Sequence, residues 1–269
     1  MAGKQVLEEE QRGMVRLLWL NRPERKNALT PELGWALAQA VERAAHDDAV
    51  RAVGISGRGD AFCSGADLNR DSGADAASGL SPQDERLDDL SWIGRFLLAI
   101  RVDCDKPVVA GINGVAVGAG VALAMCADLR IASEAANLHP GYVRAGTSPD
   151  GGLSWTLPHL VGHETALRFL FDPRFHSASE ARAMGLVGEV APEAEFVGRY
   201  LATCDRLAAL APIGVRQTKR LVVRAQLTHD LEAHLRNEMT YVGRGLSSED
   251  GKEAVRAIFE KRTPEFRGR

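Results

Sequence analysis

The stretch INGVAVGAG, residues 112–120, decides the fold of this chain. It links the β-branched run PVVAGI (107–112), which predicts a buried strand, to the apolar run 121–127, which predicts a buried helix. A second stretch with small residues, AFCSGADL (61–68), follows another β-branched run at 50–56. In both stretches a ligand could approach backbone N–H groups. Two N–H groups from separate loops can form an oxyanion hole, so the pair indicates a reaction class as well as a fold.

Size, charge and cysteine spacing exclude several classes of protein. The chain has 269 residues, enough for one large domain or two small ones. Its formal net charge is −3, so we expect no nucleic-acid partner, and a polyanion would need a local basic patch. No CxxC spacing occurs, so we expect reduced, buried thiols and neither a disulfide framework nor a metal site; the cysteines are Cys63, Cys104, Cys126 and Cys204.

The N-terminal segment shows no targeting signal. Its first eleven residues are polar and acidic and lack an apolar core, so we expect no secretory signal, and we interpret the run 8–10 (EEE) as a solvated tail. No apolar run approaches the ~20 residues that span a bilayer, so no membrane partner is expected. The default expectation is a cytoplasmic enzyme.

Strand and helix patterns alternate along the first two thirds of the chain, which predicts an α/β fold with parallel strands. Strands are predicted at 14–20, 50–56, 107–112 and 129–133, and helices at 87–100, 121–127 and 153–160. A further helix should begin after Thr30 as N-cap, with Pro31 in its first turn. Residues 69–85 should be a mobile loop. From residue 192 onward the pattern is helical, which indicates a separate packing layer or an oligomerisation surface.

A dinucleotide-binding turn is the first competing interpretation of the central stretch. Gly118 and Gly120 fit the first two glycines of GxGxxG, but the third position is Leu123. A bulky residue there opposes the close helix–strand packing that this motif needs. The nucleotide interpretation is therefore disfavoured, and glycines that serve only tight helix packing remain the other alternative.

Six segments in order carry a resemblance that covers nearly the whole chain. They are NRPERKNAL (21–29), FCSGADL (62–68), KPVVAGING (106–114), GAG (118–120), ARAMGLV (181–187) and FEKRTPEFRG (259–268). Taken together, these segments resemble the crotonase superfamily, the enoyl-CoA hydratase/isomerase family. The resemblance implies a crotonase-like spiral of ββα units over residues 1–195 and a helical C-terminal trimerisation region over 196–269. It also implies homotrimers, often paired as hexamers, and acyl-CoA thioesters as substrates with no further cofactor.

The resemblance assigns roles to particular positions. The backbone N–H groups of Ala66 and Ala119 match the two oxyanion-hole donors, which would hold the thioester oxygen as it becomes an enolate. The resemblance further implies a set of positions along the bound CoA: Arg25, Lys26, Ala28, Gly118 and Tyr142, with Ala66, Asp67 and Leu68 on the adenine side. Lys261 matches a lysine that reaches a CoA phosphate, from the same or a neighbouring subunit. For Arg25 and Lys26 the alternative is simple surface solvation.

The chain departs from the family's hydratases at both glutamate positions. The first position is Ala122, and the second falls at Tyr142 on an ungapped alignment back from Pro149. Alanine cannot transfer a proton, and tyrosine is a poor base near neutral pH because its reference pKa is about 10. The two-carboxylate machinery of a hydratase is therefore absent from the pattern.

Another carboxylate lies in the turn GTSPDGG (146–152), before the predicted helix 153–160. On its own, Asp150 could simply cap that helix or form an Asx turn. It also resembles the base of enoyl-CoA isomerases of the phenylacetate-degradation type and the nucleophile of 4-chlorobenzoyl-CoA dehalogenases. The dehalogenases' histidine and tryptophan positions hold Arg95 and Tyr142 here, which favours isomerisation. We expect Asp150 to be a catalytic base buried in an acyl pocket.

These observations predict an isomerase that converts a 3-enoyl-CoA to a 2-enoyl-CoA through an oxyanion hole and one aspartate. Three alternatives stay open. A 2-enoyl-CoA hydratase would need a second acid, for which His139 and Tyr142 are the nearest candidates. A CoA-thioester or C–C bond hydrolase would use a histidine and an aspartate for attack by water, as some relatives do, and a non-catalytic CoA-binding protein would have lost its catalytic residues.

Overall fold

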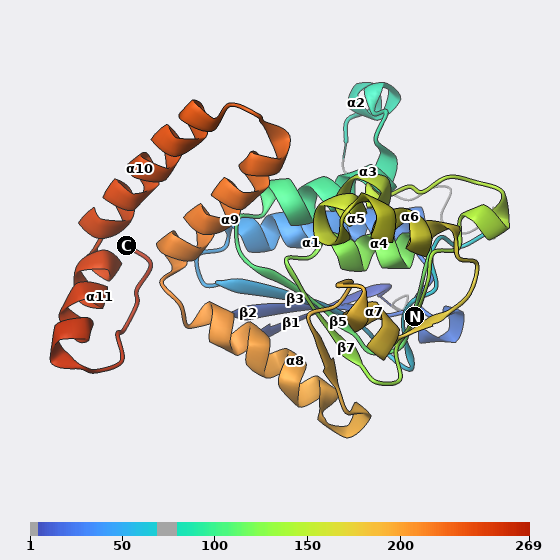
Figure 1. Cartoon of the computed structure of the whole chain (residues 1–269), viewed down its shortest axis with the longest axis horizontal. Helices are drawn as coiled ribbons and strands as arrows, with labels where there is room; N and C mark the ends of the chain where they lie inside the picture. Colours follow the sequence, from blue (N-terminus) through green and yellow to red (C-terminus); the bar gives the residue numbers. More distant parts are fainter. Residues whose placement is uncertain (1–4, 69–79) are drawn as a thin grey trace.

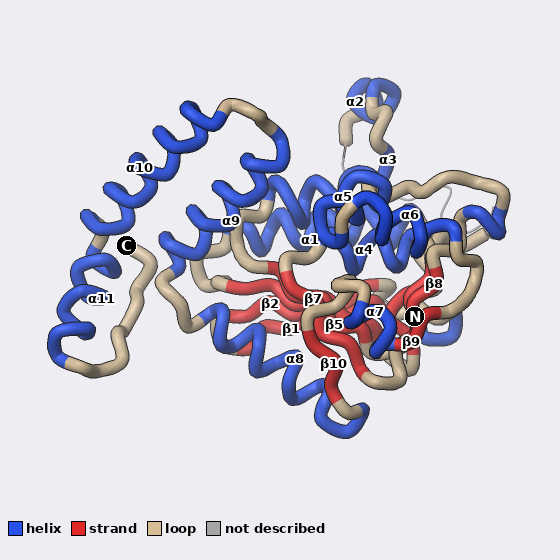
Figure 2. Tube along the Cα trace, in the orientation of Figure 1, coloured by secondary structure: helices blue, strands red, loops and turns tan. Residues whose placement is uncertain are grey.

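The computed structural model describes residues 5–68 and 80–269, and its strands form two sheets (Figure 2). The large sheet has the order β1-β2-β3-β5-β7-β10 and consists of β1 (Leu7–Arg12), β2 (Val15–Leu20), β3 (Ala52–Gly57), β5 (Val108–Ile112), β7 (Leu129–Ser133) and β10 (Glu189–Ala191). The small sheet has the order β4-β6-β8-β9 and consists of β4 (Ala61–Cys63), β6 (Val115–Val117), β8 (Asn137–His139) and β9 (His176–Ser177). Every pairing is parallel except β1–β2 and β8–β9, which confirms the predicted parallel arrangement.

From β3 to β8, successive strands alternate between the two sheets, and this alternation builds a spiral. β3, β5 and β7 lie side by side in the large sheet, while the strands that follow each of them, β4, β6 and β8, lie side by side in the small one. Each turn of the spiral therefore adds one strand to each sheet, and helices then lead the chain back to the large sheet. The predicted spiral of ββα units is confirmed.

Helices cover both faces of the large sheet and extend beyond it. In Figure 1, α1, α3, α4 and α5 lie above the sheet and α8 lies below it. The helices are α1 (Pro31–His46), α2 (Pro82–Leu87), α3 (Ser91–Leu98), α4 (Ala119–Cys126), α5 (Leu153–Val161), α6 (His163–Phe171), α7 (Ala178–Ala183), α8 (Glu193–Ala208), α9 (Pro212–Leu227), α10 (Leu231–Ser247) and α11 (Glu249–Glu260). Three short helical turns complete the set: η1 (Pro23–Arg25), the π-helical η2 (Ala99–Asp103) and η3 (Val143–Ala145).

The helix predicted after Thr30 begins as its sequence requires. The Thr30 hydroxyl accepts the Leu33 N–H at 3.2 Å, and Pro31 occupies the first turn. Leu33, Leu37 and Val41 are fully buried on one face of α1, against the sheet and α3. Helical spacing of apolar residues thus predicted both the helix and its buried face.

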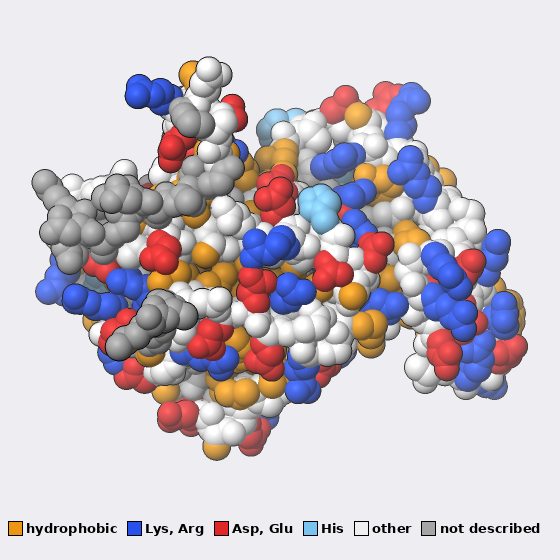
Figure 3. All heavy atoms as spheres, turned by 180° about the vertical axis from the view of Figure 1, so that it is seen from behind, with side chains coloured by type: hydrophobic (Ala, Val, Ile, Leu, Met, Phe, Trp, Pro, Cys, Tyr) orange, Lys and Arg blue, Asp and Glu red, His pale blue; other side chains and the backbone are white. Residues whose placement is uncertain are grey.

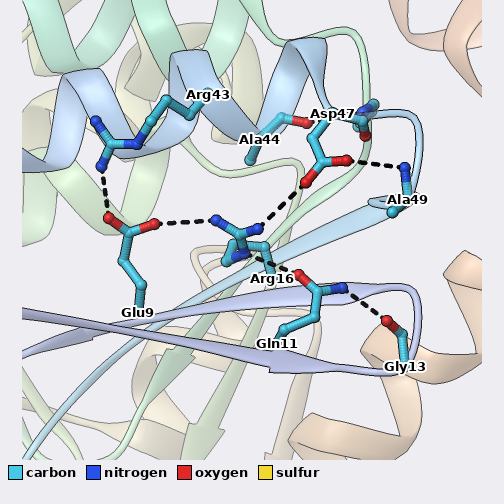
Figure 4. A network of polar contacts seen from close by, with 9 residues as sticks. Glu9, Gln11, Gly13, Arg16, Arg43, Ala44, Asp47 and Ala49 are labelled. Carbon is cyan, nitrogen blue, oxygen red and sulfur yellow. Dashed lines mark hydrogen bonds and ion pairs between the residues drawn. The ribbon is translucent and has the colours of Figure 1, made fainter.

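Two predictions near the surface are wrong. The acidic run 8–10 is not a solvated tail but part of β1, where the Glu9 carboxylate bridges Arg16, at 3.0 Å, and Arg43 (Figure 4). Pairing with β2 and with cations on neighbouring elements overrides the low strand propensity of glutamate. Of the predicted loop 69–85, residues 69–79 lie outside the described part of the chain, but 82–87 form α2, capped by Ser81.

The C-terminal helices form an arm. α9 is fixed to the core by the buried Lys219 ammonium, which donates to the carbonyls of Ile100 at 2.9 Å and Lys106 at 3.0 Å. α10 and α11 project away from the sheets (Figure 1), and Figure 3 shows acidic and basic side chains interspersed over this arm. The expected boundary between the spiral core (1–195) and the C-terminal region (196–269) falls within α8, beneath the sheet. This boundary stays a prediction. Within the described residues, no helix combines the length and apolarity needed to cross a bilayer.

Candidate functional site

Two loops that each follow a small-sheet strand meet at one end of the spiral. Gly65, after β4, has φ +94°, and a Cβ built on it would lie 2.7 Å from the Val117 carbonyl oxygen and 3.7 Å from the Ala119 nitrogen. A Cβ on Gly120 would overlap the Cys63 carbonyl. Only glycine permits this approach of the two chains. The two stretches chosen from the sequence are therefore brought together.

The first candidate oxyanion donor is the Ala66 amide. Leu29 pairs with Ala66 in an isolated parallel β-bridge. The Leu29 N–H donates to the Gly65 carbonyl and the Leu29 carbonyl accepts the Asp67 N–H, both at 2.8 Å. In such a bridge, the N–H of the residue between the two bonds points away from the partner strand. Within the described residues no partner is recorded for the Ala66 N–H, and Ala66 is exposed. The amide is therefore held in place and available to a ligand.

The second candidate donor is the Ala119 amide, at the first residue of α4. An N–H in the first turn of a helix has no carbonyl partner within that helix and lies at the positive end of the helix dipole. Gly118 precedes it with φ +52° and ψ −116°, and the Gly118 N–H donates to the His139 carbonyl at 3.0 Å. This backbone conformation favours glycine and directs the chain from β6 into α4. The helix dipole favours negative charge at the Ala119 amide.

Asp150 and Tyr142 lie together beside these loops. The Tyr142 hydroxyl donates to Asp150 Oδ1 at 2.8 Å. The Tyr142 ring is buried next to the loop that holds the second candidate oxyanion donor, with its Cζ 4.0 Å from the position of a Cβ on Gly118. Burial and the adjacent Asp150 carboxylate raise the pKa of Tyr142, so its phenol stays protonated and acts as a donor.

The turn that carries Asp150 packs against α4 at Ala122, the residue that the resemblance matches to the first glutamate of hydratases. A Cβ on Gly151 would lie 3.0 Å from Ala122 Cβ and 3.4 Å from the Phe96 ring, and Ala122 is fully buried. The space beside Ala122 is therefore filled by backbone. The expected burial of Asp150 is wrong for the single chain, because its side chain is exposed at the surface end of this turn.

The predicted CoA segment is a rigid loop. Lys26 and Asn27 both have left-handed backbones, with φ +50° and +54°. The buried Asn27 side chain donates to the carbonyls of Arg58 at 2.9 Å and Ala61 at 2.8 Å, and it accepts the Arg22 N–H at 2.9 Å. These bonds hold the two strained residues in place.

The charged side chains near this loop differ in their ion-pair partners. Lys26 pairs with Asp60 at the surface, whereas Arg25 is exposed and has no ion pair recorded within the described part of the chain. Asp67 pairs with Arg22 at 2.9 Å. The Arg22 guanidinium also donates to the Ala28 carbonyl at 2.5 Å, so this pair ties the CoA segment to the Ala66 loop. Sequence reasoning placed Asn27 in the CoA segment 25–28 without giving it a role of its own, and it missed Arg22, which lies inside the quoted motif 21–29.

Three other predicted residues lie apart from this cluster or have structural contacts. Lys261 is the exposed C-cap of α11, which lies on the opposite side of the molecule from α4 (Figure 1). Leu68 is 90% exposed at the edge of the described residues. His139, considered as a second acid, is buried with Nε2 at 3.0 Å from the Pro173 carbonyl and its ring against Phe175. These contacts favour the structural interpretation of His139.

Comparison with known proteins agrees with this geometry. Residues 10–269 match the family model for enoyl-CoA hydratase/isomerase. The chain is 35% identical over 253 residues to a probable enoyl-CoA hydratase of Rhodobacter capsulatus, covering 94% of each chain. It is 31% identical over 268 residues to the 1,2-epoxyphenylacetyl-CoA isomerase of Escherichia coli, covering 98% of each. The crystal structure of an enoyl-CoA hydratase from Bacillus anthracis superposes with a TM-score of 0.87 at 29% identity, covering 98% of this chain and all of that one. This chain is a member of the enoyl-CoA hydratase/isomerase family.

Proposed function

We propose that this family member is an isomerase that converts a 3-enoyl-CoA to a 2-enoyl-CoA, with Asp150 as its single base. The observation that carries the proposal is the pairing of the Asp150 carboxylate with Tyr142, while Ala122 lies buried beneath the same turn. Both positions expected to hold hydratase glutamates thus hold groups that cannot act as bases near neutral pH. One carboxylate beside an oxyanion hole is sufficient to move a proton between two carbons.

The proposed reaction uses the two loops together. The thioester oxygen accepts hydrogen bonds from the Ala66 and Ala119 amides, so that negative charge can build up on it. Asp150 removes a proton from C2, and the electrons of that C–H bond form a dienolate whose charge rests on the thioester oxygen. The protonated Asp150 then returns the proton to C4 as the C3=C4 double bond shifts to C2=C3. No atom is gained or lost.

We further propose that CoA lies along the 25–28 loop. The guanidinium of Arg25 is exposed, with no ion pair recorded among residues 5–68 and 80–269, and the ammonium of Lys26 lies at the surface; both are cations suited to phosphate groups. The Ala28, Asp67, Leu68 and Gly118 positions then border the path from the adenine to the thioester. Two left-handed residues held by Asn27 make this loop preorganised, which reduces the entropy lost on binding.

Hydration of a 2-enoyl-CoA is the second candidate, because several relatives are described as enoyl-CoA hydratases. It would require that Asp150 alone activate water and that Tyr142 or His139 supply the second proton. In thioester or C–C bond hydrolysis, Asp150 would likewise direct the attacking water. Binding of acyl-CoA without turnover is the remaining possibility, and the same experiment separates all of these.

The test incubates the purified protein with a 3-enoyl-CoA and with a 2-enoyl-CoA and follows mass and conjugated-enoyl absorbance. We expect conversion of the 3-enoyl substrate without a change in mass, reduced by about 10²–10⁴-fold in Asp150→Asn. Asp48→Asn is the matched control, because it changes an exposed aspartate just after the C-terminal end of α1. Gain of water that survives Asp150→Asn, or full isomerase activity in that variant, would refute the proposal.

The arm formed by α9–α11 supports a further proposal, that the chain assembles as a homotrimer, alone or paired as a hexamer. α10 presents a stripe of exposed apolar residues at helical spacing, consisting of Leu231, Leu235, Met239, Val242 and Leu246. Ile258 and Phe259 on α11 are 74% and 83% exposed. A contiguous apolar surface of this kind is typical of a protein interface. A second copy of the chain is the proposed occupant.

A further inference from the structure

One buried side chain, Tyr142, contacts both halves of the candidate site. It is 6% exposed, and its hydroxyl donates to Asp150 Oδ1 at 2.8 Å. Its ring lies beside Gly118, the residue that sets the direction of the Ala119 amide. Tyr142 itself is held by its backbone, whose carbonyl accepts the Thr147 N–H at 3.0 Å. The phenol thus connects the oxyanion loop to the carboxylate.

The protonation state of the phenol makes this contact directional. Burial, followed by the charge and hydrogen bond of Asp150, raises the pKa of Tyr142, so the hydroxyl remains protonated and donates. Oδ1 of Asp150 is therefore committed as an acceptor. Within the described residues no hydrogen bond is recorded for Oδ2, which leaves that oxygen to exchange protons. The two oxygens of one carboxylate have different environments.

Asp150 needs such a contact because of where it lies. It is exposed in a turn followed by Gly151 and Gly152, both with positive φ, and an exposed carboxylate on a turn has several rotamers open to it. A charge-assisted hydrogen bond from a buried, immobile donor selects one of them. Placement matters because displacement of a catalytic group by about 1 Å can reduce the rate by about 100-fold.

We propose that Tyr142 is a positioning residue that fixes the Asp150 carboxylate relative to the oxyanion hole and reserves Oδ2 for proton transfer. The proposal rests on the proposed role of Asp150 as base. It adds to the sequence-based expectation that Tyr142 contacts the substrate, which stays a prediction, and it assigns the hydroxyl no proton transfer of its own.

The experiment measures exchange of the C2 protons of a saturated acyl-CoA with D2O, together with kcat and KM for a 3-enoyl-CoA. We expect Tyr142→Phe, which removes only the hydroxyl, to lower the exchange rate and kcat by about 10- to 100-fold while KM changes less than about twofold. Tyr200→Phe is the matched control, because its hydroxyl is also buried but has no hydrogen-bond partner among the described residues. That control should match the unmodified protein.

A double variant distinguishes positioning from an independent effect. In the Asp150→Asn background, Tyr142→Phe should cause less than about a twofold further loss of exchange, because the two residues act as one unit. A full second loss, or near-normal kcat in Tyr142→Phe alone, would overturn the positioning role and leave Asp150 as base intact. Undiminished exchange in Asp150→Asn would instead overturn the proposed function.

Discussion

At position 65, the absence of one methyl group keeps the two loops of the site together. Gly65 has φ +94°, and a Cβ there would lie 2.7 Å from the Val117 carbonyl oxygen. We predict that Gly65→Ala lowers stability by more than the ~1–2 kcal/mol of a left-handed backbone alone. Because the Ala66 amide must move, turnover should fall by about 10²–10³-fold, as when one oxyanion donor is lost. Urea unfolding and the isomerase assay measure the two effects.

The control for this prediction separates backbone strain from crowding. Gly13, in the β1–β2 turn, has φ +54° and nothing within 4 Å of an added Cβ. Gly13→Ala should therefore show only the conformational cost and leave turnover unchanged. Equal losses of stability in the two variants, or normal turnover in Gly65→Ala, would mean that the loop tolerates the added methyl group.

At the scale of a single element, α7 carries a capping box with a strong pH signature. The Glu180 carboxylate accepts the Ser177 N–H at 2.8 Å and also binds the Ser177 hydroxyl and Arg174. The backbone bond from Ser177, followed by the Arg174 hydrogen bond, lowers the pKa of Glu180 from 4.5 to about 2. A lowered folded-state pKa means that this stability is fully present above pH 4.5 and is lost as the pH falls through about 2.

The corresponding prediction compares Glu180→Gln with the unmodified protein in urea unfolding across pH. Glutamine cannot carry the charge, so the unmodified protein should be more stable at pH 7, and the difference should shrink as the pH falls below 4.5. Glu164, which pairs with Arg168 on the exposed face of α6, provides the control variant Glu164→Gln. A difference that stays constant down to pH 2.5 would contradict the assigned pKa shift.

Long periodic elements could be predicted from the sequence, whereas short ones could not. α1, β3, β5 and β7 have enough residues for their apolar spacing to show. The small-sheet strands β4, β6, β8 and β9 have two or three residues each, so they contain no period, and their pairing depends on segments far along the chain. β1 could not be predicted for a different reason: its acidic run reads as solvated, and the arginines that pair with Glu8 and Glu9 come from other elements, as Arg58, Arg16 and Arg43.

The candidate site was predictable where it depends on backbone and not where it depends on packing. Glycines at 65, 118 and 120 carry a conformational requirement that the sequence displays directly. The contact between Tyr142 and Asp150 has no such signal, since it depends on how the 150–152 turn closes on α3. The turn packs closely against α3, because a Cβ on Gly152 would overlap the Leu97 side chain.

At the scale of the whole molecule, the apolar stripe of α10 gives a prediction about assembly. Leu235 and Met239 are 49% and 71% exposed at its centre. If a second copy covers them, the double substitution Leu235→Arg, Met239→Arg should reduce the sedimenting mass to that of one 29.0 kDa chain without loss of helical circular dichroism. Val197→Arg, which changes a 52% exposed aliphatic residue on α8, is the control. A monomeric unmodified protein would refute the assembly.

Assembly also decides what Lys261 can do. This residue caps α11 on the side of the molecule away from α4, so within one chain it is remote from the two oxyanion amides (Figure 1). If it binds a CoA phosphate, it does so in a neighbouring copy. We predict that Lys261→Ala raises KM for the acyl-CoA several-fold, with kcat nearly unchanged, because loss of one charge-assisted contact weakens ground-state and transition-state binding alike. In the background of the α10 double substitution, the same change should have no effect on KM. An equal effect in both backgrounds would place Lys261 against its own chain's substrate and contradict the geometry of the arm.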